Sequence, residues 1–202
     1  MTEVQLPAPV TDDQLTVAQA VRQRRSRRRF REEPISLQAL AQLLWCAQGV
    51  TGPRGRKRAV PSAGATFPME LYAAVGVGGV EGLDEGLYAY RPEGHVLEKL
   101  LDGDLRGDLA AAALGQDFVA RAPVAIVMAA LYSRTAGRYG ERAQRYVDME
   151  AGHISQNIYL QAEALGLATV AVGAFDDQKM AQAAHLPTDQ TPLYVMPVGF
   201  AA

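Results

Sequence analysis

The residue types best suited to chemistry form a basic run near the amino end, Arg24-Arg25-Ser26-Arg27-Arg28-Arg29-Phe30. Guanidinium groups donate paired hydrogen bonds to phosphate oxygens, and a serine hydroxyl adds a short one. In an extended segment, residues 24, 26 and 28 point the same way, so Arg24, Ser26 and Arg28 can share one anion. The run therefore predicts a phosphate site. A solvated basic stretch and a nucleic-acid patch are the alternative interpretations.

Two other segments are rich in small residues. One reads Pro61-Ser62-Ala63-Gly64-Ala65-Thr66-Phe67-Pro68, and its small side chains allow a planar ligand to approach the backbone closely. The other is Gly173-Ala174, which ends an apolar run just before Asp176, a residue type that caps helices. Backbone N–H groups at such a junction can face an electronegative atom. Taken alone, each segment is more typical of an ordinary loop.

Side chains for metal binding or nucleophilic catalysis do not form a recognisable set. His95, His153 and His185 lack the spacing of metal ligands, and the single cysteine, Cys46, provides neither a disulfide nor a zinc site. No metal is therefore expected. The glycine-rich segment 76–79 is not expected to bind a dinucleotide, because Glu81 occupies the position of the third glycine in that motif.

The composition is typical of one globular domain. The chain has 202 residues, 49% hydrophobic and 21% charged, with a net charge of −2. This charge argues against nucleic acid as a partner. The most apolar stretch, residues 122–132, is shorter than the about 20 residues that span a membrane, and the amino end lacks the pattern of a signal peptide. We expect a cytoplasmic protein without a membrane partner.

Periodicity and turn residues predict an α+β fold, because strands and helices are mixed without strict alternation. Strands are expected at 71–77, 86–90, 96–97, 123–131, 168–174 and 192–199. Helices are expected from Thr11 to the arginine run and over 37–48, 105–114, 143–165 and 177–184, with Ser36 and Asp176 as N-caps. The first ten residues are expected to form an arm before a single domain, 11–202, and residues 51–58 to form a loop.

In this order, the segments resemble the FMN-dependent nitroreductase family, most closely its SagB-type branch, which includes azoline-oxidising dehydrogenases of peptide biosynthesis. The resemblance covers roughly residues 18–200. It rests on RRSRRRF, PSAGATFPMELYAAV, GLYAY, EAGHISQNIYLQAEALGLATVAVGAFDD and PLYVMPVG. It implies a mixed central sheet flanked by helices, and a homodimer with the long central helix at its interface. It also implies two FMN sites, each built from both subunits.

The resemblance assigns contacts to the cofactor residue by residue. Its phosphate and ribityl chain would contact Arg24, Arg25, Ser26 and Arg28. Its isoalloxazine ring would contact the partner subunit's Pro61, Ser62 and Ala63, with Ala65 nearby. Gly173 and Ala174 would line the ring and offer it a backbone N–H group.

The resemblance implies an oxidoreductase with ping-pong kinetics, in which NAD(P)H reduces the flavin before a nitroaromatic, quinone or similar small acceptor takes the electrons. No catalytic side chain is required, because the cofactor carries the chemistry. The alternative in the SagB-type branch is a dehydrogenase that oxidises azoline rings in a modified peptide. Such members use a Lys-Tyr pair as base, and the corresponding position here reads Arg138-Tyr139, which makes Tyr139 the candidate base. A nucleic-acid-binding module and a flavin-storage protein are the remaining alternatives.

Overall fold

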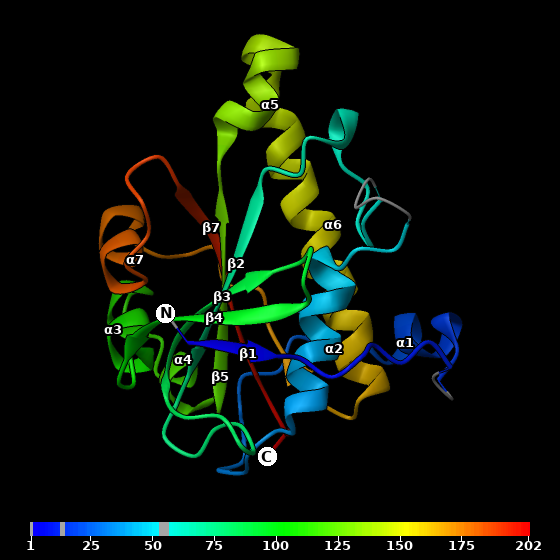
Figure 1. Cartoon of the computed structure of the whole chain (residues 1–202). Coiled ribbons are helices and arrows are strands. Elements are labelled where there is room, and N and C mark those ends of the chain that lie inside the picture. The colour runs from blue at the N-terminus through cyan, green and yellow to red at the C-terminus, as the bar shows by residue number, and fades with distance from the viewer. Residues whose placement is uncertain (1, 13–14, 53–56) are drawn as a thin grey trace.

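The structure, a computed structural model, describes residues 2–12, 15–52 and 57–202. Its centre is a seven-stranded sheet in the order β1-β4-β3-β2-β5-β7-β6, with helices on both faces (Figure 1). The strands are β1 (Glu3–Gln5), β2 (Met69–Val75), β3 (Gly86–Arg91), β4 (Val96–Asp102), β5 (Val124–Ala130), β6 (Ala168–Thr169) and β7 (Thr191–Gly199). The helical segments are α1 (Val17–Gln23), α2 (Leu37–Gln48), η2 (Ala63–Ala65), α3 (Arg106–Ala112), α4 (Phe118–Arg121), α5 (Tyr132–Tyr139), η3 (Gly140–Arg142), α6 (Ala143–Ala164) and α7 (Asp177–Ala183).

Strand β5 lies in the interior of the sheet between β2 and β7, and all of its residues are buried. Its side chains alternate between two cores. Val124 and Ile126 belong to the core that includes residues of α2 and α6, whereas Ala125 and Val127 belong to the core that includes residues of α3 and α7. Burial on both faces explains the unbroken apolar run, and the predicted central strand is confirmed.

The predicted α+β class is confirmed, with a refinement of the sheet. Within the described part of the chain, the ladders between named strands are antiparallel. Parallel pairing occurs only at isolated bridges there, and one of these bridges joins Ser26 to Thr169. The arginine run is thereby tied to the outermost strand of the sheet.

Two helices that caps and periodicity predict are confirmed. At the start of α2, the Ala39 N–H donates a hydrogen bond to Ser36 Oγ (3.1 Å). The helix ends at Gly49, where a β-carbon would lie only 2.1 Å from Cδ1 of Trp45. Helix α6 extends over 22 residues, and its apolar stripe packs against α2 and the sheet.

Three other elements differ from expectation. The first helix begins at Val17 rather than Thr11, because Thr16 and Gln19 form a reciprocal cap. The strand expected over 168–174 is reduced to β6, after which Val172 forms a single bridge with Val195. Helices α4 and α5 were not predicted, and each buries only one of its side chains.

The first ten residues, expected to form an arm, contribute the edge strand β1, which pairs with β4. Leu6 is buried, and the carbonyl oxygen of Pro7 lies 2.9 Å from Nε2 of His95. The arm therefore covers one edge of the sheet, which limits unwanted strand pairing. Part of the loop expected over 51–58 lies outside the described residues. Among the helices that the structure describes, none is both long and apolar enough to cross a membrane.

Candidate active site

The arginine run follows α1 and passes alongside the carboxyl-terminal half of α6. The guanidinium carbon of Arg24 lies 5.1 Å from the centre of the Tyr159 ring, and Arg27 forms an ion pair with Glu163. The backbone N–H of Arg27 also donates to the Thr169 carbonyl (3.0 Å). The run is thus fixed between α6 and β6.

Most of the positive charge in this run has no ion-pair partner. Of the seven arginines between residues 22 and 31, Arg27 pairs with Glu163 and Arg31 with Glu33. Within the described residues, no carboxylate pairs with the other five arginines, which are Arg22, Arg24, Arg25, Arg28 and Arg29. An anion at this surface would therefore find donors that no protein carboxylate already neutralises.

The predicted anion ligands are only partly arranged as strand alternation suggests. Arg24 and Ser26 both contact Tyr159. Arg28 instead has its guanidinium carbon 5.9 Å from the ring centre of Phe118, on α4. The guanidinium of Arg25 donates to backbone carbonyls within the same segment, at 2.8 and 3.0 Å.

The Tyr159 hydroxyl links this run to the segment before Gly173. Its oxygen lies 2.9 Å from Ser26 Oγ and accepts a hydrogen bond from the Ala171 N–H (2.8 Å). Val172 then exchanges two backbone hydrogen bonds with Val195, each 3.0 Å long. The structure therefore brings the first and third predicted segments together, with Tyr159 between them.

Gly173 and Ala174 are exposed at the end of this segment. The carbonyl of Ala174 accepts from Gln116 Nε2 (3.0 Å), whereas no described residue accepts a hydrogen bond from the Gly173 N–H. A β-carbon at position 173 would lie 3.3 Å from the Tyr194 ring. The Gly173 N–H is thus exposed where the edge of the flavin ring is expected. A larger residue at position 173 would contact the Tyr194 ring closely.

The Pro61–Ala65 loop lies elsewhere, against α5. Gly64 and Ala65 have positive φ values of 62° and 53°, and the Gly64 carbonyl accepts from the Arg138 guanidinium (3.3 Å). A β-carbon at Gly64 would lie 2.8 Å from the Tyr139 hydroxyl oxygen. The structure therefore places Tyr139, the candidate base, beside the loop that contains Ser62 and Ala63.

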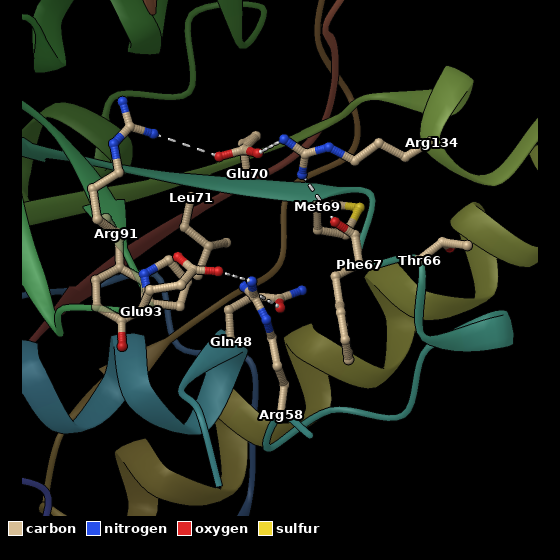
Figure 2. A pocket seen from close by; sticks show the side chains of 12 residues that line it. Gln48, Arg58, Thr66, Phe67, Met69, Glu70, Leu71, Arg91, Glu93 and Arg134 are labelled. Atoms are coloured by element: carbon tan, nitrogen blue, oxygen red, sulfur yellow. Dashed lines mark hydrogen bonds and ion pairs between the residues drawn. The ribbon is translucent and has the colours of Figure 1, made fainter. Parts of the chain in front are cut away.

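Arginines brace the carboxyl end of this loop (Figure 2). Arg134 donates to the Phe67 carbonyl (2.9 Å) and forms an ion pair with Glu70 (2.5 Å). Arg91 faces the other Glu70 oxygen at 3.7 Å. The Arg58 guanidinium carbon lies 4.8 Å from the centre of the Phe67 ring. The conformation of residues 66–70 is therefore fixed by charged side chains from three separate parts of the chain.

A buried carboxylate anchors the middle of the loop. Glu150 of α6 is 2% exposed and accepts a hydrogen bond from Gln48 Nε2 (3.5 Å). The Ser62 hydroxyl interacts with the same carboxylate and acts to lower its pKa. Ser62 Oγ accepts the Phe67 N–H (3.0 Å), so the serine hydroxyl hydrogen is available to Glu150. Burial is the main cause that raises the pKa of Glu150.

The two groups of candidate residues contact different parts of α6, as the arrangement of η2, α5 and α1 along this helix indicates (Figure 1). Ser62 interacts with Glu150, and Ser26 lies at hydrogen-bond distance from Tyr159. Glu150 and Tyr159 are nine positions apart, an axial rise of about 14 Å. Within one chain, the arginine run and the Pro61–Ala65 loop therefore lie at separate positions along α6.

Sequence reasoning missed Tyr159 and Glu150. Both lie in the long predicted helix, adjacent to its apolar positions Ile158 and Ala151. A polar side chain on the buried side of an amphipathic helix was the available signal, because buried polar groups need specific partners. Arg134 carried no such signal, since its partner Glu70 is distant in the sequence.

Comparisons with known proteins identify the family. The model of the nitroreductase family matches residues 21–200. A protein of Methanocaldococcus jannaschii named as a nitroreductase is 45% identical over 197 residues, which cover 98% of this chain and 96% of that protein. A crystal structure of a nitroreductase-type protein from Ralstonia eutropha superposes with a TM-score of 0.86 at 29% identity, covering 99% of this chain and 90% of the other.

A further relative is the trifolitoxin-processing protein TfxB of Rhizobium leguminosarum bv. trifolii. It is 33% identical over 121 residues, which cover 58% of this chain and 32% of TfxB. The fold is thus that of a nitroreductase-type oxidoreductase. The chain belongs to the nitroreductase family, and the predicted family and enzyme class are confirmed.

The Glu150 anchor predicts a pH-dependent stability. Because folding raises the pKa of Glu150 above its ordinary value of 4.5, the folded state favours the protonated acid. This contribution to stability is present below pH 4.5 and is lost as the pH rises through the folded-state pKa of Glu150. Glu150→Gln resembles the protonated acid and does not titrate, so its Tm relative to wild type should increase as the pH rises above 4.5.

Thermal unfolding across this pH range, followed by circular dichroism, measures the trend. Glu141→Gln, at an exposed position on η3, is the control and should show no such trend. A Tm difference between Glu150→Gln and wild type that is the same at every pH would contradict the assignment.

Proposed function

We propose that the protein is an FMN-dependent oxidoreductase that takes reducing equivalents from NAD(P)H and passes them to a small acceptor, such as a nitroaromatic or a quinone, by a ping-pong mechanism. The observation that carries the proposal is the juxtaposition of unpaired arginines, the Ser26 hydroxyl and the exposed backbone at Gly173. The arginine run thus offers hydrogen-bond donors for a phosphate, and the adjoining segment that ends at Gly173 offers a backbone N–H.

The residues present fit FMN. Arg24 and Ser26, which lie together at Tyr159, would hold its phosphate, with Arg25 and Arg28 of the same run nearby. The free N–H of Gly173 and the small Ala174 would face the isoalloxazine ring. When bound, FMN supplies the redox chemistry, by accepting a hydride and releasing electrons to the acceptor. The chain's own residues bind and orient it, and none of them needs to exchange a proton.

The separation of the two groups along α6 supports a homodimer. The ring of an FMN held at the arginine run would be completed by the partner subunit's Pro61, Ser62 and Ala63. Apolar side chains on α1 and α6 support such an interface, since Val17 is 73% exposed, Val21 54% and Met149 48%. Large apolar side chains exposed on the surface of two helices favour an interface there.

The first test is direct binding of FMN. Titration of the purified protein with FMN should quench flavin fluorescence, and the complex should oxidise NADH or NADPH when an acceptor is present. Arg24→Gln removes a charge-assisted bond worth about 1.5–3 kcal/mol, so FMN should bind roughly 10- to 100-fold more weakly. Lys179→Gln removes one charge from exposed α7 and serves as the control. A wild-type protein that does not bind FMN would overturn the proposal.

The shared site can be tested by mixing two defective chains. Arg24→Gln impairs the phosphate end, and Ala63→Trp fills the face expected to receive the ring. Each homodimer should bind FMN poorly. Each hybrid dimer contains one site with both halves intact, so about half of the sites in the isolated hybrids should recover.

Recovery is measured by FMN titration after co-expression with different affinity tags and isolation of the hybrid dimers. Arg24→Gln mixed with Arg28→Gln is the control. Both changes lie in the same half of the site, so no intact site forms. If the mixed Arg24→Gln and Ala63→Trp chains bind no more FMN than the separate variants, each site lies within one chain.

A second candidate function is oxidation of azoline rings in a modified peptide. Two observations favour it: the similarity to TfxB, and the position of the Tyr139 hydroxyl against Gly64. Here Tyr139 would accept the proton lost from the ring. Tyr139→Phe should then abolish oxidation of an azoline peptide, measured by mass spectrometry, while FMN binding is retained. Unchanged turnover would exclude this role for Tyr139.

A further inference from the structure

The Tyr159 hydroxyl lies within a hydrogen-bond chain whose direction matters for an anion. The phenolic oxygen accepts from the Ala171 N–H (2.8 Å) and lies 2.9 Å from Ser26 Oγ. Either oxygen of this second pair can be the donor. If Tyr159 donates, Ser26 keeps its own hydrogen for a ligand. If Ser26 donates, it offers a ligand only lone pairs, which repel an anion.

An anion therefore selects one of the two directions. A phosphate oxygen next to Ser26 accepts hydrogen bonds but donates none when fully ionised. The favourable arrangement is then a chain from the Ala171 N–H to the Tyr159 oxygen, from the Tyr159 hydroxyl to Ser26 Oγ, and from Ser26 to the phosphate. Each hydrogen bond in such a chain polarises the next one.

Tyr159 also positions a charge. The Arg24 guanidinium carbon lies 5.1 Å from the centre of the Tyr159 ring, within the range of a cation–π contact. Because Tyr159 is 9% exposed and belongs to the core, its ring cannot move with the exposed run. One buried residue thus orients two of the predicted anion ligands.

The same hydroxyl is connected to the opposite end of the site. Ala171 precedes Gly173 by two residues, and Val172 between them is fixed to Val195 by two backbone hydrogen bonds. The distance between the phosphate donors and the Gly173 N–H is therefore set through the Tyr159 contact. A ligand that uses both must have its anion and its ring at a matching separation.

We propose that Tyr159 is a positioning residue for phosphate recognition, which orients the Ser26 hydroxyl and the Arg24 guanidinium toward the phosphate of FMN. This inference rests on the proposed function and adds to it a preference for the phosphorylated flavin. Tyr159 itself does not touch the ligand, and it acts through Ser26 and Arg24.

The test compares FMN with riboflavin, which has the same ring and no phosphate. Tyr159→Phe keeps the ring under Arg24 and removes the hydroxyl. We expect its affinity for FMN to fall about tenfold and its affinity for riboflavin to change less than about twofold. Both dissociation constants are measured by quenching of flavin fluorescence. Tyr88→Phe, which loses a hydroxyl on remote β3, is the control and should leave the ratio of the two constants unchanged.

A double-mutant cycle identifies the route. Ser26→Ala should weaken FMN binding by a similar factor, and Tyr159→Phe should add little in the Ser26→Ala background, because both changes remove the same bond. Ser26 is exposed, so its replacement provides a test even if Tyr159→Phe does not fold. Unchanged FMN affinity in Ser26→Ala would overturn the inference.

The outcomes separate this inference from the proposed function. A Tyr159→Phe protein that loses FMN and riboflavin equally would indicate a merely structural tyrosine and would overturn the inference alone. A wild-type protein that binds FMN no better than riboflavin would do the same. Wild-type protein that binds neither flavin would overturn the proposed function, and the inference with it.

Discussion

Helix α6 anchors both groups of candidate site residues. Its carboxyl-terminal half holds the arginine run through Tyr159 and Glu163, and Glu150 in its other half holds the Pro61–Ala65 loop through Ser62. The rise of a helix is fixed at about 1.5 Å per residue, so these anchors cannot approach each other. A ligand that contacts both groups must either be long or lie between two chains.

The charges in the arginine run are divided between two tasks. Arg27 and Arg31 form ion pairs with Glu163 and Glu33, which attach the run to the rest of the protein. Arg24 is held by an aromatic ring instead of a carboxylate. A cation–π contact orients the guanidinium without neutralising it, so its charge remains available for an anion. Replacement of Tyr159 by a carboxylate would fix Arg24 equally well and remove that charge.

Much of the fold was predictable because it depends on local signals. Residues close together in the sequence specify the Ser36 cap, the apolar stripe of α6 and the apolar run of β5. The joining of the arginine run to the Gly173 segment was not predictable, because it passes through Tyr159, and a polar group on the buried side of a helix does not indicate its partners. Ion pairs such as Arg134 with Glu70 join distant residues, and neither residue alone indicates its partner.

Helix α5 shows why the scaffold does not by itself decide the reaction. The expected ring contacts at Ala63 and Gly173 offer small side chains and backbone, so the choice of acceptor depends on what lies next to them. Arg138 and Tyr139 occupy that position at the end of α5. This helix buries only Thr135, so most of its residues can change at little cost in stability. Substitutions in α5 can therefore change the surroundings of the proposed ring contacts and leave the proposed FMN contacts as they are.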